Sequence, residues 1–477
     1  MMKKRAKPKG WGYYTIRLLF MIGLLFAAQM YGPRLWKYYN KPPKLPINNI
    51  LSQSVLKNKK FNSTVQIIAS NKLKAYLLEE HSNPIISVDF RFEHAGSSAE
   101  TEEKGGISTI LAEMLTAGAG KWSERQFKDI CAEYGIKIGF SPSVDDFVGH
   151  IQFPRQYQQK AVALFQATMQ QPHLPEDYLQ VVQQQMLMQQ KLQQERPEKV
   201  LMNKYKEFIF AGHPYERNPL GNAQSVTGIT REDLENFKQQ YLAQDNLIVG
   251  IAGDINAEEA SALLQNLFKT LPEKSSGEKL EPLDLTSDGT EYAVERKNPQ
   301  AIAYFSAQGT FRNNVDFYPL YVANYIFGES GLNSRLSKEI REKRGLTYGI
   351  YTYLSITDAA AQIRGGFSST PENFATAKEI LRSEWLRMGQ HGVTQKELDE
   401  AKTSMIASYN LRFAAIDEIA SILTVMQKYK LGTDFLDKRN EYITKISLSE
   451  VNAAAKKYYN TLPDIVYIGA EKSEDIK

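Results

Sequence analysis

Hydrophobic and polar residues follow two periods along this chain, and these periods predict strands mixed with helices. Alternation or short apolar runs predict strands at 64–68, 74–78, 84–92, 137–143, 147–153 and 246–251. Apolar residues three and four positions apart predict helices at 107–115, 123–134, 157–169 and 176–195. The first two strands would form a hairpin around Ser70 and Asn71. The expected fold class is therefore α+β.

The second half of the chain repeats landmarks of the first half. Asn83-Pro84 before a predicted strand has a counterpart in Asn298-Pro299, and Pro154 before a predicted helix has one in Pro371. A nearly constant offset between such pairs indicates an internal duplication. Residues 271–290, which are rich in proline, serine, glycine and acidic residues, would link the two copies. We expect two homologous domains at 62–270 and 291–477, each an antiparallel sheet packed with helices.

The amino-terminal region has a different pattern. Residues 1–10 are basic, and 18–31 carry no charge. A signal-anchor at 11–33 would need Arg17 to snorkel, and a cleaved signal peptide is the alternative. No pair of small residues suitable for cleavage follows the run, which favours the anchor. The expectation is a single-pass inner-membrane protein with a cytoplasmic tail at 1–10, a tether at 34–61 and its body in the periplasm of a Gram-negative bacterium.

Composition excludes several kinds of site. The net charge is only +4 over 477 residues and no basic face alternates with aromatic residues, so nucleic acid is not an expected partner. The single cysteine, Cys131, excludes an intrachain disulfide and a cysteine-based zinc site. The six histidines are at least 13 residues apart, which excludes a zinc site built on a local histidine pair.

One stretch carries a resemblance to a known family. A strand at 84–92, a Gly-Ser-x-x-Glu turn at 96–100 and a helix after Gly105-Gly106 follow one another. This order resembles the start of an M16 (pitrilysin/insulinase-type, mitochondrial-processing-peptidase-like) metallopeptidase domain. There the helix carries His-x-x-Glu-His, whose two histidines bind zinc and whose glutamate activates water.

At the zinc-motif positions this chain departs from the family. Thr109 and Glu113 stand at the two histidine positions, and Ala112 stands at the glutamate position. The family's third ligand, a glutamate further along, aligns with Gln190, or with Gln189 when Pro197 sets the alignment. Hydroxyl and amide groups are poor zinc ligands and alanine cannot take up a proton. We therefore expect no metal ligand, no catalytic residue and no cofactor in this chain.

A second family segment is intact. Ser334-Arg335-Leu336 and the run from Arg341 to Tyr348 resemble the S-R-L…R-E-x-x-G-L-x-Y segment of M16 enzymes. The resemblance implies that Arg341 and Tyr348 bind the peptide substrate and stabilise charge on its scissile carbonyl. The alternative is that Arg341 is an ordinary cation at a helix end and Tyr348 a core residue of a strand.

These contrasts lead to a functional hypothesis. The chain would be a non-catalytic subunit of a heteromeric zinc peptidase, and its partner in a heterodimer would carry His-x-x-Glu-His and the zinc. Peptide substrates would be shared between the two subunits. The alternative is a structural or assembly protein that uses the same shell without proteolysis. An active enzyme with a novel site is a third hypothesis, which nothing in the sequence favours.

Overall fold

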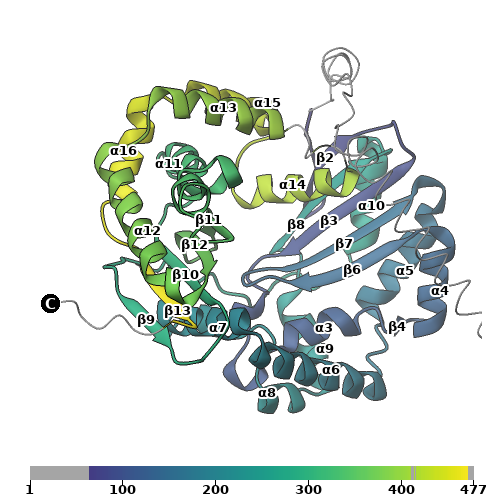
Figure 1. Ribbon diagram of the computed structural model, residues 1–477. Coiled ribbons are helices and arrows are strands. Elements are labelled where there is room, and N and C mark those ends of the chain that lie inside the picture. The colour runs from purple at the N-terminus through teal and green to yellow at the C-terminus, as the bar shows by residue number, and fades with distance from the viewer. Residues whose placement is uncertain (1–63, 410–412, 414, 471–477) are drawn as a thin grey trace, which may run out of the picture. The chain divides into compact units, whose positions relative to one another are not determined.

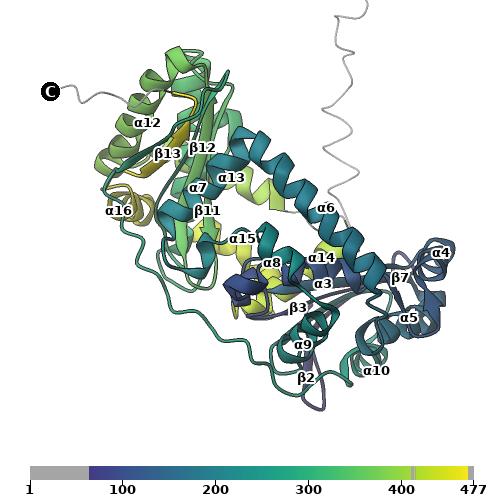
Figure 2. The same cartoon turned by 90° about the horizontal axis from the view of Figure 1, so that it is seen from below.

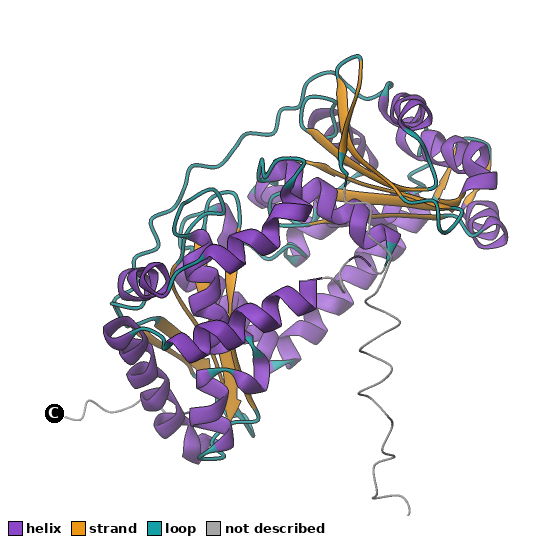
Figure 3. Cartoon of the chain, turned by 90° about the horizontal axis from the view of Figure 1, so that it is seen from above, coloured by secondary structure: helices purple, strands orange, loops and turns teal. Residues whose placement is uncertain are grey.

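The computed structural model describes residues 64–409, 413 and 415–470. These residues form two large β-sheets, each packed against helices (Figures 1 and 3). The first sheet and its helices come from residues 66–268, and the second sheet and most of its helices come from residues 291–468. Between them, from Lys269 to Thr290, the chain contains no helix or strand.

The first sheet has six strands in the order β1-β2-β8-β3-β7-β6. Its strands are β1 (Gln66–Ser70), β2 (Leu73–Glu79), β3 (Ile85–Phe92), β6 (Lys137–Pro142), β7 (Phe147–Pro154) and β8 (Leu247–Gly253). The short β4 (Gly118–Ala119) and β5 (Trp122–Ser123) pair separately. Each predicted strand of this half is present, within two residues of its expected ends.

Eight α-helices accompany this sheet. They are α3 (Ile107–Met114), α4 (Glu124–Tyr134), α5 (Gln158–Gln170), α6 (Glu176–Glu195), α7 (Pro197–Ile209), α8 (Ala223–Thr227), α9 (Arg231–Tyr241) and α10 (Ala257–Phe268). The four helices predicted in this half are α3 to α6. The Ser123 side chain caps α4 by accepting a hydrogen bond from the Gln126 amide.

The second sheet has five strands in the order β11-β12-β10-β13-β9. The strands are β9 (Glu291–Val294), β10 (Ala301–Gln308), β11 (Gly349–Ile356), β12 (Ala361–Ser369) and β13 (Asp464–Ile468). The α-helices of this half are α11 (Phe317–Asn324), α12 (Pro371–His391), α13 (Gln395–Tyr409), α14 (Ile416–Lys428), α15 (Phe435–Lys445) and α16 (Leu448–Tyr458). Two π-helices, Tyr325–Glu329 and Ser337–Glu342, follow α11.

The two sheets share one topology, which confirms the predicted duplication. In reverse, the second order β9-β13-β10-β12-β11 matches β2-β8-β3-β7-β6 of the first sheet, to which β1 is added. In both sheets a phenylalanine covers a glycine in register with it, Phe90 over Gly149 and Phe305 over Gly365. The prediction of purely antiparallel sheets is wrong, because β2 pairs with β8, and β13 with β9, in parallel.

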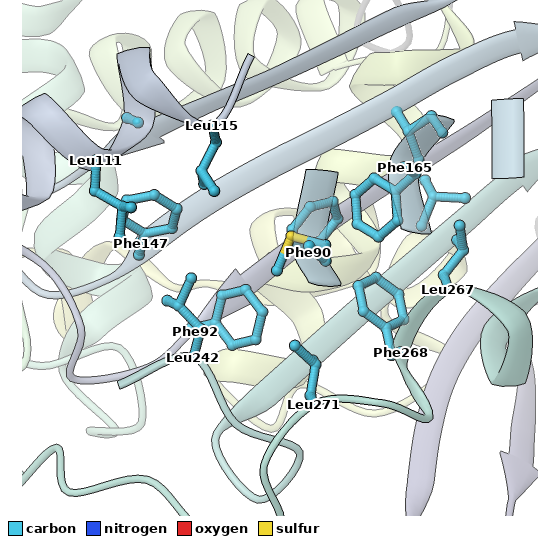
Figure 4. Close-up of a cluster of buried hydrophobic side chains, with 14 of the residues drawn as sticks. Phe90, Phe92, Leu111, Leu115, Phe147, Phe165, Leu242, Leu267, Phe268 and Leu271 are labelled. Carbon is cyan, nitrogen blue, oxygen red and sulfur yellow. The ribbon is translucent and has the colours of Figure 1, made fainter. Parts of the chain in front are cut away.

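The first core lies between its sheet and α3, α5 and α10. Phe90 packs edge-to-face against Phe165 and Phe268, with ring centroids 5.4 and 5.1 Å apart. Leu111 and Leu115 lie beside Phe147 in the same cluster (Figure 4). The apolar stripe of α3 is therefore buried, and this burial fixes which residues of α3 face away from the sheet.

Each sheet is also contacted by a helix from the other half of the chain. α14, from the second half, packs on β8 and β3 of the first sheet (Figure 1). α7, from the first half, packs on β10 and β13 of the second sheet. This exchange joins the two halves through buried surface as well as through the connecting segment.

The structure contradicts the expected location in the inner membrane. Within residues 64–409, 413 and 415–470, no helix is both long enough and apolar enough to cross a membrane. The segments on which the expectation rested, 1–10, 11–33 and 34–61, lie outside the described residues. The predicted anchor therefore has no support among the described residues.

Candidate functional site

Helix α3 corresponds to the helix that carries the zinc motif in the family that the sequence resembles. Hydrogen bonds to its N-terminal backbone amides hold it in place. Two backbone amides, of Gly106 and Ser108, donate to the Glu100 carboxylate at 2.7 and 2.9 Å. Glu100 is the last residue of the Gly-Ser-x-x-Glu turn, and its carboxylate accepts from donors that the first turn of a helix leaves free. Burial raises the pKa of Glu100 to about 7. The sequence showed the turn but not this role.

The start of α3 lies against a second turn, Pro219–Gly221. Gly106 has φ +95°, and a Cβ there would lie 3.1 Å from the Leu220 carbonyl oxygen. A Cβ on Gly221 would lie 2.1 Å from the Gly105 carbonyl oxygen. Glycine is required at both places because the two backbones approach so closely.

Thr109 and Gln190 both donate to this turn. The Thr109 hydroxyl donates to the Pro219 carbonyl at 3.1 Å, and the Gln190 amide donates to the Leu220 carbonyl at 2.8 Å. Two positions aligned with zinc ligands are thus brought together from α3 and α6, but as hydrogen-bond donors to the backbone. Gln189, the other aligned residue, is exposed.

The remaining motif positions are separated from this pair. Ala112 is buried at 7% exposure, and Glu113 is exposed on α3 with no ion pair in the described part of the chain. Among the described residues, no group of three or more His, Cys, Asp or Glu side chains could hold a metal ion. A neutral hydroxyl oxygen and a neutral amide oxygen are poor ligands for zinc beside imidazole, thiolate or carboxylate, so these residues do not fit the family's metal.

Arg341 and Tyr348 both precede β11, the first strand in the order of the second sheet. Arg341 is exposed in the last turn of the π-helix Ser337–Glu342. Tyr348 directly precedes β11 and is 69% exposed, so it is not a core residue of a strand. No ion pair or hydrogen bond of either side chain is found among the described residues, and none joins them to α3 or α6. Both side chains are free to contact a ligand.

Neighbouring arginines have structural partners instead. Arg344 donates to the Glu339 carboxylate at 2.9 Å and to the Glu339 carbonyl. Arg335 forms a two-pronged pair with Glu397 at 2.6 and 2.7 Å. Arg341 therefore differs from both in having no carboxylate partner in the part of the chain that the structure describes.

Family models cover both halves of the chain. Residues 77–222 match "Insulinase (Peptidase family M16)", and residues 228–405 match "Peptidase M16 inactive domain". The chain belongs to the M16 family. It is an inactive-type member, since it carries none of the zinc ligands at the matching positions.

Relatives and solved structures agree with this assignment. The "Non-peptidase homolog YmxG" of Helicobacter pylori is 26% identical over 82% of this chain and 90% of that protein. An "Uncharacterized zinc protease" of Rickettsia felis is 22% identical over 78% of this chain and 90% of that protein. A peptidase M16 inactive domain from Pseudomonas fluorescens has a TM-score of 0.80 at 24% identity, over 86% of this chain and 99% of that one.

Proposed function

We propose that this chain is the non-catalytic subunit of a heteromeric M16 zinc peptidase and contributes peptide binding to it. A partner bearing His-x-x-Glu-His would supply the metal and the catalytic glutamate. The single observation that carries the proposal is a contrast within one chain: Thr109 and Gln190 bond to backbone carbonyls, whereas Arg341 and Tyr348 are exposed and unpaired among the described residues.

The chemistry of this pair suits a peptide. The guanidinium of Arg341 offers several N–H donors in a fixed plane, and the Tyr348 hydroxyl can donate to a carbonyl or to the oxyanion that develops from it. Since Arg341 has no described carboxylate partner, its charge is available to the ligand.

A structural or assembly role is the second candidate. The hydrogen bonds of Thr109 and Gln190 turn the former ligand positions into packing contacts, and this favours a chain that no longer needs a metal for any step. The same shell could then hold a partner without proteolysis.

The proposal is tested in a reconstituted complex with a partner that carries His-x-x-Glu-His. Arg341→Ala should lower the rate of peptide cleavage by about 100-fold or more while the complex stays assembled, because a donor to the oxyanion is worth ~3–4 kcal/mol. Tyr348→Phe should act in the same direction, because it removes only the hydroxyl. Cleavage rates and the mass of the complex are measured for each variant.

Arg344→Ala is the matched control, since Arg344 lies in the same segment but pairs with Glu339. It should leave the cleavage rate within about threefold of the wild type. Equal effects of Arg341→Ala and Arg344→Ala, or dissociation of the complex by Arg341→Ala, would remove the substrate role and favour the assembly role.

A further inference from the structure

β11 is an edge strand with one open side. It stands first in the order β11-β12-β10-β13-β9 and pairs with β12 along its full length, from Gly349 opposite Ser368 to Ile356 opposite Ala361. In the described part of the chain no strand pairs with its outer side. An edge strand offers a row of backbone donors and acceptors that another extended segment can use.

Exposed tyrosines gather on this strand. Tyr351 and Tyr353 are 47% and 38% exposed, and Tyr348, just before the strand, is 69% exposed. The rings of Tyr351 and Tyr353 stack with centroids 6.2 Å apart and planes 20° apart. Adjacent exposed aromatic side chains mark an interaction surface more often than isolated ones do.

The tyrosines lie on the face of the sheet that α7 contacts. Tyr351 and Tyr304 both lie against Gly366, on the same side of β12. Tyr304 in turn contacts the ring of Tyr205 on α7, with centroids 6.3 Å apart. α7 thus packs on the β10 and β13 side of this face, while the β11 side keeps its tyrosines accessible.

Arg364 lies between α7 and the edge strand and has no carboxylate partner among the described residues. Arg364 of β12 is in register with Tyr353, and its guanidinium carbon lies 4.5 Å from the ring centre of Tyr205. No carboxylate lies within ion-pair distance of Arg364 among the described residues. Burial, and at a distance the charge of Glu198, raise the pKa of Tyr304. Burial and the charge of Arg364 lower the pKa of Lys206 to about 8, so two positive charges are close together.

We propose that β11 binds an extended peptide segment as an added strand, with an acidic side chain of that segment directed toward Arg364 and apolar or aromatic side chains on Tyr351 and Tyr353. The open edge requires an extended backbone, since only a strand can use its donors and acceptors. The unpaired arginine selects an acidic side chain by charge complementarity. The eight residues of β11 set the length of the segment at about eight residues.

This inference extends the proposed peptide-binding function. It rests on that proposal for the class of ligand, which is a peptide. It adds a site and a selectivity that Arg341 and Tyr348 do not supply. Tyr348 lies at the start of β11, so a segment added along the strand would lead toward the Arg341 and Tyr348 pair.

Peptide binding is measured with the full chain by fluorescence anisotropy. The probe is a labelled ten-residue peptide of alternating threonine and valine with one central glutamate. A second peptide has glutamine in its place, and a third has alternate backbone nitrogens methylated. The glutamate peptide should bind about fivefold more tightly than the glutamine peptide. The methylated peptide should bind at least tenfold more weakly, because it cannot complete the edge.

Variants locate the site. Arg364→Gln should remove the difference between the glutamate and glutamine peptides, which is the coupling that a double-mutant cycle isolates. Tyr351→Thr with Tyr353→Thr should weaken binding of both peptides about tenfold. Tyr292→Thr is the matched control, because Tyr292 is 42% exposed on β9, the opposite edge of the same sheet, and it should leave affinity unchanged.

Hydrogen exchange on the unmodified chain makes the test independent of folding in the variants. Addition of the glutamate peptide should protect amides in 349–356 and leave those in 291–294 unchanged. Protection elsewhere, no binding of the glutamate peptide, or loss of binding in Tyr292→Thr would overturn the inference. A dimer seen by light scattering would also overturn it if the double variant Tyr351→Thr, Tyr353→Thr dissociated that dimer, because a second copy of the chain would then occupy the edge.

The two proposals fail separately. If Arg341→Ala stops cleavage in the complex but 349–356 gains no protection, the subunit role stands and the edge-strand site is rejected. If 349–356 is protected but no partner yields a peptide-cleaving complex, the edge-strand site stands and the peptidase role is rejected.

Discussion

The side chains at the former zinc positions show how single residues can retain a helix and change its chemistry. Thr109 and Gln190 keep the polar character of this surface, but each donates to a carbonyl of the Pro219–Leu220 turn. Each hydrogen bond to a backbone carbonyl contributes about 1 kcal/mol. Gln189 and Gln190 could not be separated by sequence spacing, and the structure selects Gln190 as the inward one.

Metal analysis tests this picture at the residue scale. The full chain, dialysed and then analysed for metals, should hold no stoichiometric zinc, because no free nitrogen or carboxylate set converges at α3 and α6. The four-fold variant Thr109→His, Ala112→Glu, Glu113→His and Gln190→Glu restores the family's ligands and base and should gain zinc. One tightly held zinc in the wild type would show that the chain binds metal through residues other than these.

At the scale of elements, a buried carboxylate that precedes α3 in the chain holds the start of this helix. Glu100 is 5% exposed and accepts hydrogen bonds from Gly106 and Ser108. The helix is short, so these bonds and its buried apolar stripe hold it more than helix propensity does. Because burial raises the pKa of this carboxyl, its protonation links the stability of the fold to pH.

The predicted pH effect follows from the raised pKa of Glu100, about 7 against an ordinary 4.5. Between these values the folded chain keeps a proton that the unfolded chain releases. The free energy of unfolding should therefore fall by about 3 kcal/mol as pH rises through this window; the contribution is complete below it and lost above it. Urea unfolding across the window should show this slope in the wild type and not in Glu100→Gln.

Glu102→Gln serves as the control for the pH effect, because Glu102 is an exposed carboxylate two residues further along the chain. Its slope should match that of the wild type. An unchanged slope in Glu100→Gln would assign the pH dependence to other groups.

At the scale of the whole molecule, buried charged groups hold α14 against the first half of the chain. Lys428, at the end of α14, pairs with Asp146 of the first half at 2.7 Å and with Asp358 of the second half at 3.0 Å. These carboxylates raise the pKa of Lys428 against the effect of burial, so it remains charged. Asp146 also pairs with Arg91, which donates to Thr424 on α14.

Lys428→Ala should lower the free energy of unfolding by about 3 kcal/mol, because removing one member of a buried pair leaves carboxylates without their partner. Denaturant unfolding measures the change. Lys438→Ala on α15 is the control: its pair with Asp434 is half exposed, and its loss should cost less than about 1 kcal/mol. Equal losses in the two variants would mean that the buried charges do not hold α14 in place.

Much of the fold followed from the sequence because it depends on local periodicity. Burial of one stripe or one face imposes a period of 3.6 or 2, so α3, α6, β3 and β7 were predictable within a few residues. The repeated landmarks predicted the duplication. Parallel pairing of β2 with β8 was not predictable, since nothing in a strand's own sequence records the direction of its neighbour.

The candidate site likewise has features that the sequence alone determined and features that only the structure showed. Loss of two zinc ligands at Thr109 and Glu113, and of the catalytic glutamate at Ala112, is a matter of residue identity, and the sequence alone determined it. Only the tertiary structure showed that Thr109 and Gln190 donate to one turn, that Tyr348 is exposed, and that Arg364 of β12 lies in register with Tyr353 of the edge strand β11. These properties depend on which distant segment covers a surface, and helix α7, which ends 139 residues before Tyr348, covers only part of that sheet.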